Sequence, residues 1–127
     1  MTKKAVGILG FTAALTMGMS LAHAEGDSAA GEKVFKKCKA CHVIDSDKNR
    51  LGPTLHGVMG RQAGSVEGFK YSQAMQDSGL TWDEATLDKY LADPKGTVPK
   101  NKMAFAGLKK EQDRADVIAY LKEASGS

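Results

Sequence analysis

Two cysteines and a histidine stand close together in the chain, in the order Cys38-Lys39-Ala40-Cys41-His42, and the sequence has no other cysteine. A spacing of three positions puts both thiols on one side of a helical turn, where they can add to the two vinyl groups of a haem. The histidine that follows can present its imidazole to the iron. The motif predicts covalent attachment of one c-type haem through Cys38 and Cys41, with His42 as an iron ligand.

Three other uses of these residues fit less well. A thioredoxin-like redox site needs a neighbouring strand and a βαβ pattern, and the sequence indicates neither. A structural zinc site needs four ligands, yet after residue 24 the only further candidate, His56, lies fourteen positions after His42 rather than three to five. A plain disulfide would leave His42 without a role.

The second axial ligand decides what a haem iron can do, because an open position favours gas or peroxide chemistry and a methionine raises the potential. Three methionines follow the motif. Met75 falls on an apolar position of a short helix and fits core packing, and Met59 fits either packing or the surface. Met103 stands in a proline-bounded loop between small residues. We therefore predict Met103 as the ligand, with His56 as the alternative.

The N-terminal residues 1–24 have the pattern of a cleaved secretory signal peptide. Lys3 and Lys4 precede an uncharged stretch to Leu21, and Ala22-His23-Ala24 has the small-x-small cleavage pattern. The alternative, a membrane anchor, fits less well because glycine, serine and threonine interrupt the stretch. Export to the periplasm agrees with covalent haem. Without the leader the formal net charge falls from +3 to +1, and residues 25–127 remain as one domain.

The mature chain is expected to be all-α, with four to five short helices and long loops wrapped around the haem. Ser28 is the expected cap of the first helix, and Thr81 opens a capping box before the third. Residues 43–68 and 94–107 carry the glycines and prolines of irregular loops. The apolar spacing predicts helices over residues 28–37, 71–78, 82–92 and 109–124.

Across residues 25–127 the chain resembles the class I c-type cytochromes, the monohaem family that includes mitochondrial cytochrome c and soluble bacterial counterparts. The resemblance implies the cytochrome c fold. The motifs that carry it are, in order, Gly31-x-x-x-Phe35-x-x-Cys38-x-x-Cys41-His42, Gly52-Pro53-x-Leu55-x-Gly57, Gly60-Arg61, Gly68-Phe69-x-Tyr71-Ser72, Leu80-Thr81-Trp82, Tyr90-Leu91-x-Asp93-Pro94-Lys95, Lys102-Met103-x-Phe105-x-Gly107 and Arg114-x-Asp116-Val117-Ile118-Ala119-Tyr120-Leu121.

The resemblance also implies roles for polar residues around the haem. The carbonyl of Pro53 would accept a hydrogen bond from the outer N–H of His42 and fix its orientation. Tyr71 and Trp82 would donate to a haem propionate, and Arg61 would offset the propionate charge.

The same resemblance places two polar residues, Tyr90 and Asn101, near the sulfur of Met103, where they would tune the iron. Gly31 and Phe35 would pack against the last helix at residues 120–121, a structural role with no chemistry.

We expect an electron carrier rather than an enzyme, a monomer that serves respiratory or photosynthetic electron transport. Its partners would be quinol–cytochrome c oxidoreductase, a terminal oxidase, a photosynthetic reaction centre or a reductase. The basic residues that the family places around the haem edge would attract acidic patches on these partners. They are Lys37, Lys39, Lys95, Lys100, Lys102, Lys109 and Lys110.

Two other functions compete with a diffusing carrier. In an enzyme or sensor, Met103 would leave the iron so that peroxide or a gas could bind, although the sequence lacks an evident distal acid–base pair. In a second alternative, the domain would stay docked to a dehydrogenase as its electron outlet. Nucleic-acid binding is not expected, because the basic segments carry few aromatic residues.

Overall fold

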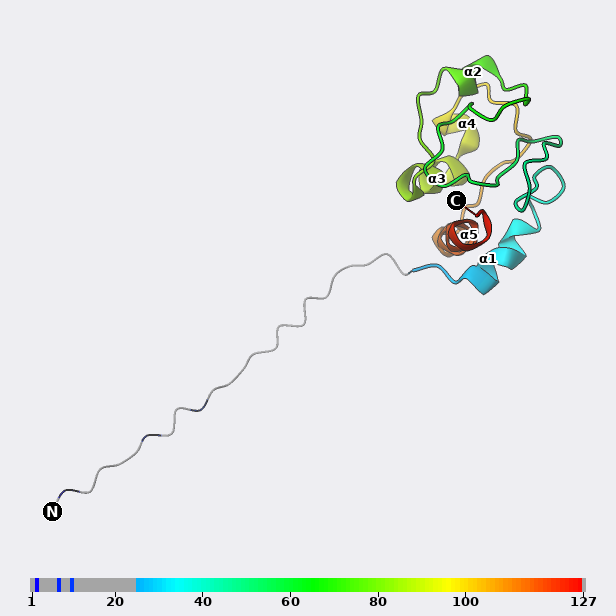
Figure 1. Ribbon diagram of the computed structural model, residues 1–127. Coiled ribbons are helices and arrows are strands. Elements are labelled where there is room, and N and C mark those ends of the chain that lie inside the picture. Colours follow the sequence, from blue (N-terminus) through cyan, green and yellow to red (C-terminus); the bar gives the residue numbers. More distant parts are fainter. Residues whose placement is uncertain (1, 3–6, 8–9, 11–24, 127) are drawn as a thin grey trace.

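The computed structural model describes Thr2, Gly7, Gly10 and residues 25–126, so the leader predicted over 1–24 otherwise lies outside the described residues. The described part has helices and no strand, which confirms the all-α prediction (Figure 1). No helix within it is long and apolar enough to cross a membrane. The helices are α1 (Ser28–Phe35), α2 (Gln73–Gln76), α3 (Glu84–Ala92), α4 (Pro94–Thr97) and α5 (Glu111–Ala124).

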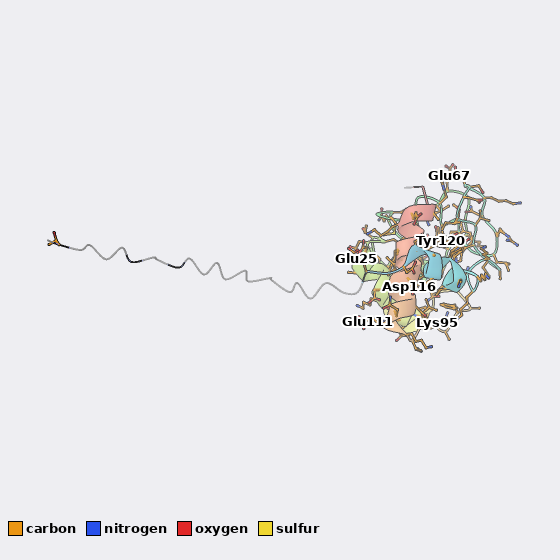
Figure 2. All side chains as sticks on the ribbon, turned by 90° about the horizontal axis from the view of Figure 1, so that it is seen from below. Glu25, Glu67, Lys95, Glu111, Asp116 and Tyr120 are labelled. Carbon is orange, nitrogen blue, oxygen red and sulfur yellow. The ribbon has the colours of Figure 1, made fainter. Side chains whose placement is uncertain are left out.

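The first and last helices, α1 and α5, pack against each other and bring the two ends of the domain together (Figure 1). The rings of Phe35 and Tyr120 lie 5.2 Å apart, and the backbone N–H of Asp27 donates to Asp116 Oδ1 at 2.8 Å. Both Asp116 and Tyr120 lie on α5 (Figure 2). Gly31 of α1 is buried directly against Asp116 and Tyr120 of α5, which confirms the predicted pairing of the terminal helices.

Both predicted helix caps are wrong by one or two residues. Asp27 rather than Ser28 caps α1, accepting from the N–H of Ala29 at 2.9 Å. Asp83 rather than Thr81 caps α3, and its hydrogen bond from the backbone N–H of Thr86 lowers the pKa of the Asp83 carboxyl. Aspartate is as good a cap as serine or threonine, so neighbouring candidates compete.

Trp82 stays outside α3 because its backbone pairs with a neighbouring loop. Its N–H donates to the carbonyl of Arg61 at 2.8 Å, and its carbonyl accepts from the N–H of Gly60 at 2.9 Å. These bonds hold the chain around Trp82 extended against the loop after α1. The indole is therefore placed by long-range contacts rather than by a helix.

The loop predicted over residues 94–107 begins with the short helix α4, which the sequence analysis did not predict. Pro94 occupies the first turn, where its missing N–H costs nothing, and Asp93 Oδ1 accepts from the N–H of Gly96 at 2.9 Å. Beyond the helix, Lys100 has a positive φ of 67°. The irregular part of the loop is thus shorter than predicted, because it begins only after α4.

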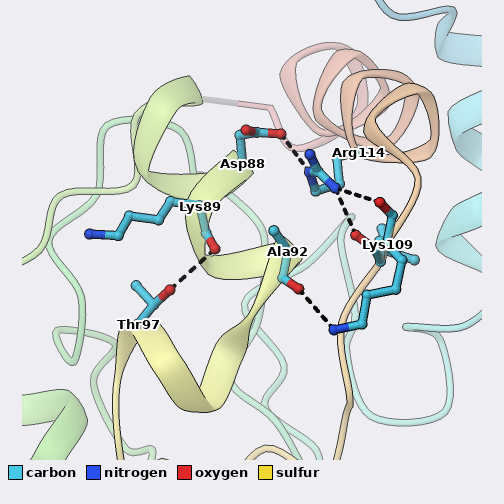
Figure 3. A network of polar contacts seen from close by, with 7 residues as sticks. Asp88, Lys89, Ala92, Thr97, Lys109 and Arg114 are labelled. Carbon is cyan, nitrogen blue, oxygen red and sulfur yellow. Dashed lines mark hydrogen bonds and ion pairs between the residues drawn. The ribbon is translucent and has the colours of Figure 1, made fainter.

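A polar network joins α3, α4, and the start of α5 (Figure 3). Arg114 Nε pairs with Asp88 Oδ1 at 2.7 Å, and Arg114 Nη1 donates to the carbonyls of Leu108 and Lys109 at 2.9 and 3.1 Å. Thr97 Oγ1 donates to the carbonyl of Lys89 at 3.2 Å. These contacts hold the end of the 98–110 loop against α3.

Candidate haem-binding site

A largely apolar cavity of about 440 Å³ lies between the helices and the two long loops. Apolar side chains from four parts of the chain form its walls, including Val58, Leu87, Leu108 and Leu121. All of the predicted site residues line it. They are Cys38, Cys41, His42, Pro53, Arg61, Tyr71, Trp82, Tyr90, Asn101 and Met103.

His42 is held by a carbonyl on one side of its ring. The turn after α1 continues through the motif, with the N–H of His42 donating to the carbonyl of Cys38 at 2.9 Å. His42 Nδ1 lies 2.7 Å from the carbonyl oxygen of Pro53, so this nitrogen carries the proton and Nε2 keeps its lone pair. Burial lowers the pKa of His42 and favours this neutral form.

The ring of His42 lies directly against the backbone of Gly52. A Cβ at Gly52 would lie 2.4 Å from His42 Cε1, so only glycine fits. This role of Gly52 was not predicted from the sequence. The only sequence signal is that a glycine precedes Pro53. That signal does not indicate a contact with His42, ten positions earlier.

The two cysteines also face the cavity, one helical turn apart. Burial, with a smaller effect of neighbouring Cys41, raises the pKa of the Cys38 thiol to about 11. Apolar surroundings of this kind suit thioether bonds, which carry no charge.

Asn101 fixes the backbone that carries Met103. Its buried amide donates to the carbonyls of Pro94 and Val98, both at 2.9 Å, and its Oδ1 accepts from the N–H of Met103 at 2.9 Å. Tyr90 Oη lies 4.0 Å from Met103 Sδ. Burial raises the pKa of Tyr90 to about 12, so its hydroxyl keeps its proton.

The other candidates for the second axial ligand lie in different places. Met75, from α2, also lines the cavity, whereas Met59 packs against the core outside its lining. His56 does not line the cavity, and its Nδ1 lies 3.3 Å from the carbonyl oxygen of Ile44. The cavity therefore contains two methionines and no histidine other than His42.

Arg61 gives the cavity a cationic end. Its Nη1 and Nη2 donate to the carbonyls of His56 and Thr54 at 3.1 and 2.9 Å, while its buried Nε has no partner among the described residues. Tyr71 Oη accepts from the N–H of Val66 at 3.1 Å, which leaves the hydroxyl proton for another acceptor. A carboxylate here would satisfy both donors.

These features fit a haem. The apolar walls suit its macrocycle, the unpartnered Arg61 Nε suits a propionate, and His42 presents a lone pair beside two cysteines. An all-α chain with a Cys-x-x-Cys-His turn at such a cavity defines a c-type haem protein.

Comparisons with known proteins give the family. Residues 28–125 match the Cytochrome c family, to which the chain belongs. The chain is 56% identical over 119 residues to cytochrome c2 of Rhodomicrobium vannielii, covering 93% of this chain and 94% of that protein. It is 62% identical over 88 residues to cytochrome c2 iso-2 of Magnetospirillum fulvum, covering 69% and 92%.

A solved structure agrees with the fold. That of cytochrome cH from Methylobacterium extorquens matches with a TM-score of 0.74 and 52% identity, covering 77% of this chain and 99% of that one. Family membership confirms three predictions: the cytochrome c fold, covalent haem c on Cys38 and Cys41, and electron transfer rather than enzyme catalysis.

Proposed function

We propose that this protein is a soluble periplasmic electron carrier whose haem iron is held by His42 and Met103. The haem supplies one-electron Fe(III)/Fe(II) chemistry. The proposal rests on two side chains that line the same cavity. His42 is hydrogen-bonded to a backbone carbonyl, and Met103 lies beside a buried tyrosine hydroxyl. The chain's part is to fix both ligands and to exclude water.

The proposed roles of the chain's residues follow from their contacts. Pro53 holds Nδ1 of His42, so that Nε2 would be free to bind the iron. Asn101 holds the backbone of Met103, and Tyr90 places a hydroxyl near the thioether. Apolar walls and a thioether ligand favour the reduced, less charged iron, which predicts a positive potential.

The polar end of the cavity would hold the propionates. Arg61 would use its unpartnered Nε, and Tyr71 its hydroxyl proton. Trp82, whose extended backbone is tied to Arg61, would add a third donor from its indole.

The relatives named cytochrome c2 support a carrier in bacterial electron transport. In this proposal residues 1–24 are a cleaved signal peptide and residues 25–127 are the periplasmic domain. The electron donors and acceptors would be quinol–cytochrome c oxidoreductase, a terminal oxidase, a photosynthetic reaction centre or a reductase.

Replacing Met103 tests the ligand assignment. We expect the purified Met103→Ala holoprotein to lose the weak near-infrared iron–sulfur charge-transfer band of the oxidised protein, because alanine offers no sulfur. The measurement is the absorption spectrum of the oxidised and reduced protein. Met75→Ala is the matched control, since it removes the other cavity methionine and should keep the band. A band that survives Met103→Ala, or disappears only in Met75→Ala, would refute the assignment.

Lysines at the cavity rim should govern docking to an acidic partner. Lys37 and Lys102 line the cavity, and Lys102 is exposed. We expect Lys102→Glu to slow the bimolecular reaction with quinol–cytochrome c oxidoreductase several-fold at low salt, with the difference shrinking as salt screens the charges. Stopped-flow kinetics over a salt series measure this. Lys33→Glu, at an exposed position of α1 that does not line the cavity, is the charge-matched control, and an equal effect there would contradict a localised docking face.

A further inference from the structure

The peptide unit between Pro53 and Thr54 is hydrogen-bonded on both sides. Its carbonyl oxygen lies 2.7 Å from His42 Nδ1, and its N–H donates to Asn49 Oδ1 at 2.9 Å. An amide whose N–H is engaged becomes a stronger acceptor at its oxygen, because hydrogen bonds in a chain polarise one another. The side chain of Asn49 is thus linked to His42 through a single amide.

The orientation of the Asn49 side chain is determined by its two partners. Its Nδ2 donates to the carbonyl of Glu67 at 3.2 Å, and that oxygen can only accept. The N–H of Thr54 can only donate, so Oδ1 must face it. Asn49 therefore does two things: it joins the 43–55 loop to the 62–69 loop, and it polarises the amide that holds His42.

Thr54 keeps this amide in place. Its side chain is buried, and its Oγ1 donates to the carbonyl of Ser46 and accepts from the N–H of His56 at 3.1 Å. With the loop fixed on both sides of the amide, a change at Asn49 alters the bonding of the amide more than its position.

We propose that Asn49 is a positioning residue that increases the electron-donating strength of His42 through the Pro53–Thr54 amide and so lowers the reduction potential. The inference rests on the proposed iron ligation by His42. Stronger acceptance at the Pro53 oxygen draws the Nδ1 proton away from the ring. The ring then donates more density from Nε2, which favours the oxidised iron.

A purely structural role for Asn49 gives the opposite sign. If the residue only joined two loops, its loss would loosen them and admit water to the cavity. Water stabilises the more charged, oxidised iron and would lower the potential. Loss of the polarising bond raises the potential instead, so the direction of the shift separates the two roles.

The test is the midpoint potential of the Asn49→Leu holoprotein. Leucine has a similar shape but makes neither hydrogen bond. We expect the equilibrium constant for reduction to rise about threefold, which is about 30 mV at 59 mV per tenfold for one electron. In the reduced protein, the His42 Nδ1–H proton resonance should also move upfield, as its hydrogen bond weakens. A potential that falls or stays unchanged, or an unmoved resonance, would overturn the inference.

Asn49→Asp keeps the inference testable if the leucine variant does not fold. Aspartate retains the acceptor for the N–H of Thr54 and loses the donor to Glu67. The potential should fall further than in Lys48→Gln, which makes the same change in net charge at the exposed neighbouring position. The His42 Nδ1–H resonance should also move downfield, because the stronger acceptor tightens its hydrogen bond, whereas loosened loops would not move it in that direction. An equal fall in the two variants would mean that charge alone acts.

Failure of this inference and failure of the proposed function can be distinguished. If the wild-type spectrum shows the iron–sulfur band and the Asn49 variants do not shift as expected, only the role of Asn49 is wrong. If the wild type lacks the band, ligation by Met103 is wrong and the proposed function fails, while the shifts of the Asn49 variants still test the link to His42.

Discussion

Without its haem, the chain should not fold into the structure of Figure 1. The cavity of about 440 Å³ would be left empty between the helices and the loops. At about 24 cal/mol for each Å³ of cavity, this void costs about 10 kcal/mol. Domains of this size are stable by only about 5–15 kcal/mol in total, so the cost removes most or all of that stability.

The apolar walls would collapse inward or take up water in the haem-free chain, and either change disrupts the site. The segments between α1 and α3 are mostly irregular and fold around the cavity, so much of their order depends on what they enclose. We therefore expect weak helical signal and no sharp unfolding transition.

The Cys38→Ala/Cys41→Ala double variant, purified free of haem, provides the measurement. Circular dichroism and chemical denaturation should show a poorly folded chain, whereas the wild-type holoprotein from the same expression system should unfold cooperatively. The absorption spectrum verifies that the variant carries no haem. A compact haem-free protein with a cooperative transition would contradict the prediction.

The positions of the site residues were largely predictable from the sequence, because the chemistry is concentrated in short motifs. Cys38, Cys41 and His42 lie within one turn, so their mutual geometry is local. Met103 could be selected by its proline-bounded loop, and it does line the cavity. Its role as a ligand stays a prediction.

Long-range contacts of single atoms could not be predicted. Two examples are the packing of Gly52 against the ring of His42 and the hydrogen bond from the N–H of Thr54 to Asn49. No periodic pattern predicts these contacts, because both depend on how an irregular loop folds back. The sequence indicated such a loop over residues 43–68 without its path.

Helix ends were predicted less well than helix positions, for a local reason. Asp27 and Ser28 are neighbours in the chain, and Thr81 and Asp83 lie two positions apart. The intrinsic N-cap preferences of these residue types differ little. At α3 the choice is made by Trp82, whose backbone pairs with the loop at Arg61 instead of joining the helix.

The closest approach of α1 and α5 depends on the absence of a side chain at Gly31. A Cβ there would lie 1.9 Å from the carbonyl oxygen of Asp116 and 2.8 Å from Cβ of Tyr120. Gly31→Ala should therefore force the helices apart, disturb the packing of Phe35 on Tyr120, and destabilise the holoprotein by about 3 kcal/mol. The measurement is the midpoint of denaturant unfolding.

Helix propensity alone predicts the opposite sign, since alanine is favoured over glycine in a helix by about 1 kcal/mol. Ala29→Gly, the reverse exchange at an exposed position in the first turn of the same helix, provides the matched control and should cost at most about that amount. If Gly31→Ala proved as stable as the wild type, the two helices could not cross as closely as the structure places them. A loss of stability well above that of Ala29→Gly would instead show that α1 and α5 are held together by their steric fit. Intrinsic helix propensity would then be the smaller effect in closing the domain around the haem.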